Sequence, residues 1–324
     1  MQSELSVAMC TFNGERYLRG QLQSIAAQDH PPKELIICDD GSADGTVKIV
    51  HDFAARAAFP VHYFANEHTL GSTKNFEKAI SLCQGSIVVL ADQDDTWYPF
   101  KLGRIATEFA KAPEAVAVFS DADLIDDESK PLGFKLWSTL RFQPSEQHRF
   151  TRGQALEILL KHPVVTGATM AFRRSLFDLV APFPADEIHD RWLSFLLAVL
   201  GLFRLIPEPL MQYRRHQSQQ VGPGPLRLKE SVRQARERQA TFYWEEIDHY
   251  RRFRDGLLRL PSEIPSVCSA AIKIDRKITH LEHRARLGRG AMQRIPDVLH
   301  EVLNGHYWRY SGGLRSIAKD LALR

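Results

Sequence analysis

Short apolar runs alternate with amphipathic segments along the first 125 residues of the chain. Five runs rich in Val, Ile or Ala and bounded by polar residues are typical of β-strands: 5–12, 34–40, 61–67, 86–95 and 115–123. Four segments between them place apolar residues on one helical face: 15–28, 46–57, 72–84 and 101–112. Because the strands are almost continuously apolar, the pattern predicts an α/β fold with a mostly parallel sheet flanked by helices.

The pattern changes after residue 125. Residues 126–165 lack a clear period, so we expect an irregular segment that covers the site. A strand, a helix and another strand are predicted next, at 166–172, 186–201 and 203–217. The run VGPGP at 221–225 predicts a boundary between a domain over 1–222 and a helical extension over 226–324. Apolar residues at helical spacing in the extension predict two antiparallel helices, within 227–260 and over 267–285.

Composition limits the class of protein. The 324 residues are 44% apolar and 25% charged, which is typical of a globular protein, and the net charge of +3 does not favour nucleic-acid binding. Residues 227–324 hold 20 basic and 12 acidic side chains, against 22 and 27 in the remainder. This asymmetry favours contact between the extension and an anionic surface, with a solvated helical face as an equal alternative.

The cysteines are widely separated and form no CxxC pair, which predicts buried free thiols in a reducing compartment: Cys10, Cys38, Cys83 and Cys268. The N-terminus lacks the basic and apolar regions of a signal peptide. The longest apolar run, 193–203, is shorter than the roughly 20 residues that cross a bilayer. We therefore expect a cytoplasmic protein, either free or peripheral at the inner face of the membrane.

Polar side chains gather where four of the predicted strands end. They are Thr11 and Asn13 after the first strand, Asp39 and Asp40 after the second, Asp92, Asp94 and Asp95 after the fourth, and Asp121 and Asp123 after the fifth. In parallel α/β sheets, ligands bind beyond the carboxyl ends of the strands. The sequence therefore predicts a binding site at this edge of the sheet.

The group formed by Asp92, Asp94 and Asp95 has the chemistry of a divalent-cation site. Mg²⁺ and Mn²⁺ prefer carboxylate oxygens, and Mg²⁺ is often held by one or two carboxylates together with substrate phosphates. A cation would also offset the repulsion between the three charges. The alternative is a solvated acidic turn that caps the next helix, and the companion acidic groups favour the metal site.

Two glycine-containing turns precede the second and third helices. The first, CDDGSADGT at 38–46, resembles a calcium loop, but its twelfth position is His51 and its flanks are a strand and a helix, so we reject calcium. A turn at Gly41 leaves one of the two leading carboxylates to accept hydrogen bonds from a ligand. In the second turn, Gly71 and Lys74 suit a phosphate at a helix N-terminus, or they serve only as a helix start.

Two later motifs carry candidate chemistry. His189 and Asp190 begin an apolar helix, where a carboxylate can act as a general base or can simply cap the helix. The run YRRHQ at 213–217 follows a strand, and its cations could meet a diphosphate or remain solvated.

In this order, the motifs resemble the family 2 glycosyltransferases, which have the GT-A fold. The resemblance covers roughly residues 4–220 and rests on VAMCTFNGERYLRGQLQSIAAQ, LIICDDGSADGT, LADQDDTWYPFKL, TGATMAFRR, HDRWL and YRRHQ. The forms DQDDTW and YRRH are similar to those of bacterial rhamnosyltransferase-like enzymes that build O-antigen or other surface polysaccharides. The chain departs from the pattern after YRRH, where it reads QSQQVG and relatives often carry Gly and Asn.

The resemblance implies roles for individual residues. Cys10, Thr11, Phe12 and Asp40 are implied to hold the nucleotide base, with Gly71 and Lys74 also on the donor side. The acidic group is implied to contact the ribose (Asp92) and a metal-bound diphosphate (Asp94, Asp95), and His216 is a weaker metal candidate. Asp190 is the implied catalytic base of an inverting transfer. Mg²⁺ or Mn²⁺ is the implied cofactor, a nucleotide sugar such as dTDP-rhamnose or a UDP-sugar the donor, and a saccharide, free or lipid-linked, the acceptor.

Two rival functions stay open at this point. A phosphatase with a strand-end nucleophile typically has DxDGT, whereas Asp95 and Thr96 follow Asp94 here. A non-catalytic nucleotide-sugar-binding or scaffold protein would need the same binding residues. For the basic C-terminal helices, contact with an anionic membrane and packing within the protein or a homodimer are equal alternatives.

Overall fold

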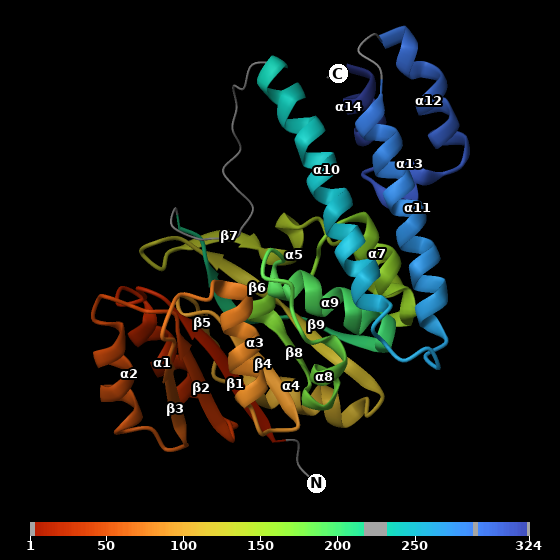
Figure 1. The fold of residues 1–324 in the computed structure, drawn as a ribbon. Helices are drawn as coiled ribbons and strands as arrows, with labels where there is room; N and C mark the ends of the chain where they lie inside the picture. The colour runs from red at the N-terminus through yellow and green to blue at the C-terminus, as the bar shows by residue number, and fades with distance from the viewer. Residues whose placement is uncertain (1–3, 217–231, 288–290, 323–324) are drawn as a thin grey trace. The chain divides into compact units, whose positions relative to one another are not determined.

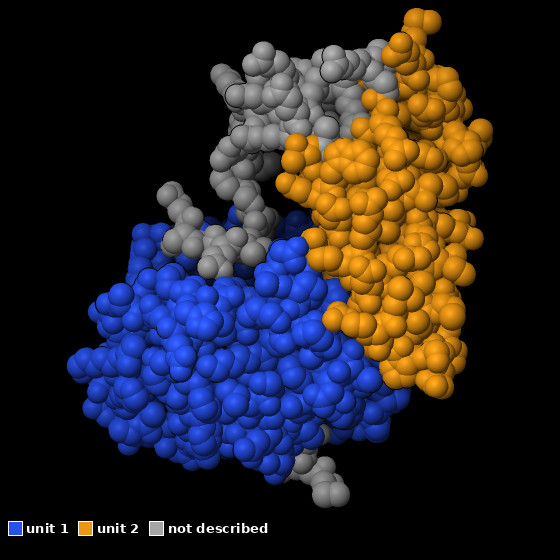
Figure 2. Space-filling view, viewed as in Figure 1, with its two compact units in different colours: residues 1–153, 164–223 blue, residues 154–163, 224–324 orange. Residues whose placement is uncertain are grey.

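The computed structural model describes residues 4–216, 232–287 and 291–322. The chain divides into two compact units (Figure 2). The first unit holds residues 1–153 and 164–223, and the second holds 154–163 and 224–324. The sequence pattern did not predict that residues 154–163 group with the C-terminal part. Residues 221–225, on which the predicted boundary depends, lie outside the described residues.

The first unit is built on one nine-stranded sheet (Figure 1). Its strands are β1 (Leu5–Thr11), β2 (Glu34–Asp39), β3 (Val61–Ala65), β4 (Ile87–Ala91), β5 (Thr96–Trp97), β6 (Ala115–Ile125), β7 (Pro131–Lys135), β8 (Met170–Arg173) and β9 (Leu202–Arg214). The order is β3-β2-β1-β4-β8-β6-β9-β5, and β7 pairs with β6. Strands β8, β5 and β7 run antiparallel to their neighbours, and the other pairs are parallel. The predicted α/β class and the mostly parallel sheet are confirmed.

Helices cover both faces of this sheet. They are α1 (Leu18–Ala26), α2 (Thr46–Ala54), α3 (Ser72–Leu82), α4 (Lys101–Lys111), α5 (Leu136–Thr139), α6 (Pro144–Arg149), α8 (Phe177–Val180) and α9 (His189–Leu200). Alternate residues of β1 pack with buried residues of α1 and α4 in one core. Helix α3 packs against β1, β2 and α9, and its buried residues lie outside that core. Each fully buried Leu, Ile or Val stabilises this arrangement by about 1.5–3 kcal/mol.

Three details of the first unit differ from the prediction. The irregular segment expected over 126–165 contains β7 and three helices, α5, α6 and α7. The strand expected from residue 166 begins at Met170, after a 3₁₀ turn at Gly167–Thr169. Strand β6 continues to Ile125, so Asp121 and Asp123 lie inside the strand and not after it. The Asp121 carboxylate accepts the backbone N–H of Trp137, and that of Asp123 accepts the Tyr98 hydroxyl, so both acids are used in packing the fold.

The second unit is helical. It contains α7 (Ala155–Lys161), α10 (Val232–Leu257), α11 (Ser266–Arg286), α12 (Ala291–Leu303), α13 (His306–Tyr310) and α14 (Leu314–Ala322). Helices α10 and α11 run antiparallel, as their apolar spacing predicts (Figure 1). Tyr243, Ile247 and Tyr250 of α10 and Ile274 and Leu281 of α11 are buried. Among the described residues, no helix has both the length and the apolar character that crossing a membrane requires.

Candidate active site

The loops after β1 and β2 are joined by side-chain hydrogen bonds. The Thr11 hydroxyl donates to Asp39 over 2.6 Å, and the backbone N–H of Asn13 donates to the Ser42 hydroxyl over 2.8 Å. The Asn13 side-chain oxygen accepts the N–H of Ala43, and Asn13 has a φ of 47°, a conformation that asparagine tolerates better than most residues. These bonds fix the backbone at the end of β1, where the family resemblance implies that the nucleotide base binds.

Asp40 organises the loop that leads into α3. Its carboxylate accepts hydrogen bonds from the Asn66 side chain (2.8 Å) and from the N–H groups of Leu70 (2.7 Å) and Gly71 (2.9 Å). Gly71 has a φ of 80°, which favours glycine at this position. Both Asp39 and Asp40 therefore accept internal hydrogen bonds, and the contact of one of them with a ligand stays a prediction. Lys74, the predicted phosphate contact, pairs with Glu77 over 2.5 Å.

The acidic cluster (Asp92, Asp94 and Asp95) begins directly after β4, which pairs with β1. Between its members, Gln93 accepts the N–H of Phe12 (2.9 Å) and donates to the Phe12 carbonyl (3.0 Å), so the loops after β1 and β4 are clamped together. The Phe12 ring is 43% exposed and is available to a ligand. Cys10 lies in β1, just before these loops. Burial, and then the charges of nearby groups, raises the pKa of its thiol well above the usual value.

The members of the acidic cluster have different surroundings. The Asp94 carboxylate lies 2.7 Å from His216 Nε2. Asp95 is only 1% exposed, and its Oδ1 accepts the N–H of Arg214 over 2.9 Å. Its Oδ2 is buried and has no hydrogen-bond partner within the described chain. The fold thus joins Asp94 to His216 and turns Asp95 toward the interior.

Burial and mutual repulsion define the electrostatics of this cluster. Burial, then the charges of Asp94 and Asp190, raises the pKa of Asp92. Burial, then the charges of Asp94 and Asp92, raises the pKa of Asp95. A carboxylate whose pKa is raised by like charges favours a cation nearby. The cluster is therefore short of positive charge.

Lys101, a buried residue of α4, supplies positive charge to the acidic cluster. It is fully buried, donates to the Ala168 carbonyl over 2.7 Å and lies 4.0 Å from the centre of the Trp97 ring. Burial lowers the pKa of Lys101, and the charges of Asp95 and Asp92 oppose that shift. Sequence reasoning missed this residue, although a signal was present: Lys101 shares the buried face of α4 with Ile105 and Phe109.

Asp190 is held at the start of α9. Its Oδ2 accepts the N–H of Gly167 over 2.8 Å, and its Oδ1 makes no hydrogen bond to the described residues. A Cβ at Gly167 would lie 2.8 Å from His189 Nε2 and 3.2 Å from the Asp190 Cβ, so only glycine fits there without a shift. The His189 ring stacks on Phe76 at 3.9 Å, and burial lowers its pKa. Asp190 is bonded to the 3₁₀ turn Gly167–Thr169, and that turn packs against β4, the strand that the acidic cluster follows. The base candidate therefore lies near the acidic cluster, and its charge contributes to the raised pKa of Asp92.

Comparison with known proteins decides the family. The family described as glycosyl transferase family 2 matches residues 6–180, which is more than half of the chain. The chain belongs to glycosyl transferase family 2. The match includes the loops after β1, β2 and β4 and ends before Asp190 and His216.

Several relatives of this family 2 chain are known from sequence. An uncharacterized glycosyltransferase of Nostoc is 27% identical over 226 residues, with 66% of this chain and 65% of the relative covered. An uncharacterized protein of Mycobacterium bovis is 28% identical over 215 residues, with 65% and 59% covered. The chain therefore spans less than two thirds of these relatives' own length. An uncharacterized glycosyltransferase of Haemophilus influenzae is 22% identical, with 75% of each chain covered.

Solved structures confirm the fold of the family 2 chain. S. aureus TarS 1–349 in complex with UDP-GlcNAc has a TM-score of 0.60 at 16% identity, with 91% of this chain and 79% of TarS covered. The mannosyltransferase PcManGT from Pyrobaculum calidifontis, in complex with GDP-Man and Mn²⁺, has a TM-score of 0.55 at 16% identity, with 100% and 85% covered. At such identities the likeness shows the fold alone, and it confirms the GT-A class.

One predicted cation of the YRRHQ motif, Arg214, has a different use in this family 2 chain. The Arg214 guanidinium donates to the carbonyl groups of Asp94 (2.7 Å) and Asp126 (2.9 Å), and it lies over the Tyr17 ring. Arg214 is 5% exposed, so it braces the loops and does not face outward to a diphosphate. Burial, then the charges of the surrounding carboxylates, raises the pKa of Tyr213, which keeps its hydroxyl protonated. Gln217 lies outside the described residues.

The predicted metal ligands fit a cation that is shared with a substrate. Asp94 and His216 are adjacent, but Asp95 does not complete a trio with them: within the described part of the chain, the one trio of carboxylate and imidazole atoms within 4.8 Å of each other lies in the second unit. One or two protein ligands are enough when phosphates fill the other positions of Mg²⁺. The raised pKa values of Asp92 and Asp95 agree with such a cation.

Proposed function

We propose that this chain transfers a sugar from a nucleoside-diphosphate sugar to a hydroxyl of a saccharide acceptor, with inversion at the anomeric carbon. The observation that carries the proposal is that the acidic cluster directly follows β4, and that the 3₁₀ turn packed against β4 holds Asp190 through the N–H of Gly167. A residue suited to a metal-bound diphosphate and a residue suited to proton removal therefore lie near each other. The family, and the nucleotide sugars named for the TarS and PcManGT structures, support a nucleotide-sugar donor.

The donor lies across the ends of β1, β2 and β4 in this proposal. The backbone of Cys10 and Thr11 and the exposed ring of Phe12 face the nucleotide base. Asp40 fixes the loop at Gly71 and provides a polar edge for the base. Asp92 contacts the ribose. Lys74 reaches the phosphates only if its ion pair with Glu77 opens.

Asp94 and His216 would hold a divalent cation, and Asp95 supports the loop through its bond to the Arg214 N–H. Mg²⁺ or Mn²⁺ bound there supplies positive charge that stabilises the leaving diphosphate. The Mn²⁺ named for the PcManGT structure supports this choice.

Asp190 performs the proton transfer. Its Oδ2 is fixed by the N–H of Gly167, so Oδ1 can accept the proton of the acceptor hydroxyl. The hydroxyl oxygen then forms the new bond to the anomeric carbon, and the bond from that carbon to the diphosphate oxygen breaks, with its electron pair leaving on the diphosphate. Attack from the face opposite the leaving group inverts the configuration.

Substitution of Asp190 tests the base. Asp190→Asn keeps the hydrogen bond from Gly167 but cannot take up a proton, so we expect turnover to fall roughly 10²–10⁴-fold with little change in donor affinity. Release of nucleoside diphosphate, with and without acceptor, measures turnover, and calorimetry measures donor affinity. Asp178→Asn, at an exposed acid of the same unit, is the matched control. Near-normal turnover of Asp190→Asn would show that the base is assigned wrongly.

The donor screen separates the proposed enzyme from its rivals. A panel with dTDP-rhamnose, UDP-sugars and GDP-sugars is assayed with Mg²⁺ or Mn²⁺, and thermal shifts report binding. Acceptor-dependent release of nucleoside diphosphate supports a hexosyltransferase, and binding without release indicates a non-catalytic protein. Release of inorganic phosphate from a phosphate monoester in a parallel assay indicates a phosphatase. The motif forms favour dTDP-rhamnose or a UDP-sugar and a role in O-antigen-like surface polysaccharide. Full activity in excess EDTA would contradict the metal.

We further propose that the second unit contacts an anionic membrane that carries a lipid-linked acceptor. Apolar side chains of α12 form one exposed row at helical spacing: Met292, Ile295, Leu299 and Leu303. Trp308 of α13 is 48% exposed, and exposed Arg309 and Arg315 add positive charge. The alternative for this row is a homodimer interface.

Vesicle flotation distinguishes these two occupants. Leu299→Glu with Leu303→Glu should abolish flotation with anionic vesicles, whereas Leu258→Glu, at an isolated exposed leucine, should not. Light scattering gives the mass of each variant. The membrane proposal is wrong if the unaltered chain does not bind vesicles and forms a dimer that the double substitution dissociates. The row would then be a homodimer interface.

A further inference from the structure

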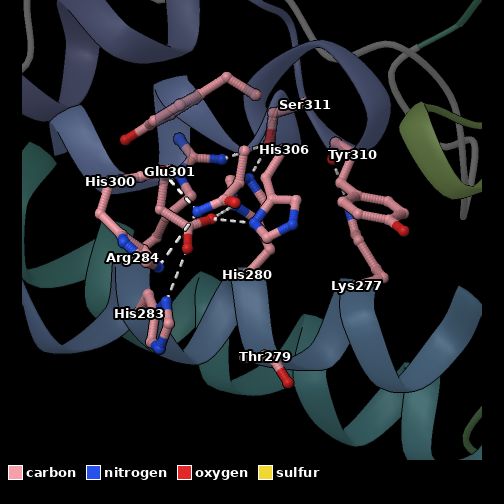
Figure 3. A network of polar contacts seen from close by, with 12 residues as sticks. Lys277, Thr279, His280, His283, Arg284, His300, Glu301, His306, Tyr310 and Ser311 are labelled. Carbon is pink, nitrogen blue, oxygen red and sulfur yellow. Dashed lines mark hydrogen bonds and ion pairs between the residues drawn. The ribbon is translucent and has the colours of Figure 1, made fainter. Parts of the chain in front are cut away.

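Three histidines surround one glutamate in the second unit (Figure 3). His280 and His283 come from α11, Glu301 from α12 and His306 from α13. The Nδ1 atoms of His280 and His306 both contact Glu301 Oε2, the latter over 3.0 Å, and His283 Nδ1 contacts Oε1 over 2.7 Å. We call these four residues the imidazole cluster. No step of the proposed sugar transfer uses them.

Three of these side chains converge as metal ligands do. One ligand atom from each of His280, Glu301 and His306 lies within 4.8 Å of the other two. In a tetrahedral zinc site with bonds of about 2.1 Å, neighbouring ligand atoms are roughly 3.4 Å apart. The present contacts from Glu301 to the two imidazoles are shorter than that, so the side chains need to move outward by less than about 1 Å to admit an ion.

The surroundings match the outer shell of a histidine-ligated metal. A ligating imidazole usually donates its second N–H to a polar group, which fixes the ring. His280 Nε2 lies 2.9 Å from the Ser311 hydroxyl, so the ring can donate there while Nδ1 faces Glu301. His283 holds the other carboxylate oxygen and orients Glu301. Arg284 also contacts Ser311, and its charge is paired with Asp320 over 2.6 Å.

Burial favours the form of histidine that binds metals. His280 is fully buried and Glu301 is 2% exposed, whereas the His306 side chain is 22% exposed. Burial lowers the pKa of His280 to about 4, so its imidazole is neutral near pH 7. A neutral ring can move its proton from Nδ1 to Nε2 and present Nδ1 to an ion without net proton release.

We propose that His280, Glu301 and His306 bind a transition-metal ion of the zinc class, with a fourth position open to water. Imidazole ligands suit Zn²⁺, Co²⁺ and Ni²⁺, whereas Mg²⁺ prefers oxygen. The ion would link α11, α12 and α13 and so stabilise the packing of these helices in the second unit. This site is separate from the carboxylate site of the sheet and does not depend on the proposed transfer reaction.

Metal binding to the full chain tests the proposal directly. The chelator-stripped protein is titrated with Zn²⁺ or Co²⁺ in excess Mg²⁺, which competes for the carboxylates of the first unit. The first-unit pair, Asp94 and His216, offers one imidazole, so two imidazole ligands on the ion identify the site proposed here. We expect about one Zn²⁺ per chain, visible Co²⁺ bands of the intensity typical of four-coordinate cobalt, and a rise in melting temperature. X-ray absorption at the zinc edge should report imidazole ligands. An oxygen-only shell, or no binding under these conditions, overturns the site.

Matched variants locate the ion. His306→Gln and Glu301→Gln should each weaken Zn²⁺ binding at least ~10-fold. His300→Gln is the control, because His300 lies on α12 beside Glu301 but contacts Asn304. Equal Zn²⁺ affinity in His306→Gln, Glu301→Gln and the unaltered chain contradicts the proposal. If a variant does not fold, the absorption spectrum of the unaltered chain still decides the ligands.

Discussion

Buried acids meet opposite environments in the two units of the molecule. In the acidic cluster, burial and neighbouring carboxylates raise the pKa values of Asp92 and Asp95. In the imidazole cluster, burial also acts to raise the pKa of Glu301, but hydrogen bonds from His280 and His283 outweigh it and lower the pKa to about 2. The difference shows which carboxylates have their partners within the chain. Without a metal ion, Glu301 is held by hydrogen bonds from histidines of the chain, whereas the carboxylates of the acidic cluster repel one another and have Lys101 as their buried positive charge.

The largest expected effect comes from removing that lysine. Lys101→Met keeps the length of the side chain but leaves Asp92 and Asp95 without their buried cation, and we expect a loss of about 3–5 kcal/mol in stability. Hydrogen exchange of the β4 and α4 amides measures the local free energy of opening. Lys111→Met, at a half-exposed lysine of the same helix, should cost less than about 1 kcal/mol. Equal losses in the two variants would show that Lys101 does not compensate the acidic cluster.

Lowering the pH should reduce the stability of the folded chain through the imidazole cluster. Burial lowers the pKa of His280 from about 6.5 to about 4, so the unfolded chain takes up a proton first as the pH falls, and stability is lost between pH 6.5 and 4. For Glu301, whose folded pKa is about 2, stability is present above pH 4.5 and is lost as the pH falls toward 2. We expect the first window to cost on the order of 3 kcal/mol.

Hydrogen exchange of the α11 and α13 amides in metal-free protein, corrected for intrinsic rates, measures this loss. His280→Gln removes the titrating group and should flatten the window between pH 6.5 and 4. The β1 and β2 amides of the first unit serve as the internal reference. An unchanged profile in the variant would mean that another group carries the pH dependence.

The two clusters also differ in how far the sequence predicts them. Asp92, Asp94 and Asp95 are neighbours in the chain and follow an apolar run, so the rule for strand ends places them at the binding edge. The imidazole cluster spans residues 280–306 on three helices, and only the packing of those helices brings it together. Its histidines have no diagnostic spacing, so the sequence analysis did not single them out.

Most elements of the first unit follow from local periodicity, because buried strands and amphipathic helices differ in period. Details that depend on neighbours were missed. Asp121 and Asp123 look like strand-end acids in sequence, but pairing with β9 and β7 carries β6 past them. Arg214 looks like a surface cation, and only the structure shows the carbonyl groups that it binds.

Displacing Asp190 from its position near the acidic cluster should have a smaller effect, which appears in the kinetics. Gly167→Ala places a methyl group against His189 and Asp190, and we expect activity to fall roughly 10–10²-fold because the base is displaced. Turnover with saturating donor measures the effect. In Gly20→Ala, where a Cβ meets nothing within 4 Å, activity should be retained and stability should rise by about 0.5–1 kcal/mol. Normal turnover of Gly167→Ala would show that the position of Asp190 does not matter for the reaction.

The smallest expected effect concerns the clamp that joins the loops after β1 and β4. Gln93→Ala removes two hydrogen bonds to the Phe12 backbone, and, because the loops are exposed, we expect a loss of only about 1 kcal/mol. If these loops hold the donor, the loss appears as a several-fold higher KM for donor at nearly constant kcat. Gln147→Ala removes a similar side-chain bond to the Phe142 carbonyl, away from the acidic cluster, and should leave KM unchanged. Equal KM values in the two variants would mean that the acidic cluster tolerates motion of these loops. The carboxylates of the cluster, and not the Gln93 clamp, would then set the affinity for donor.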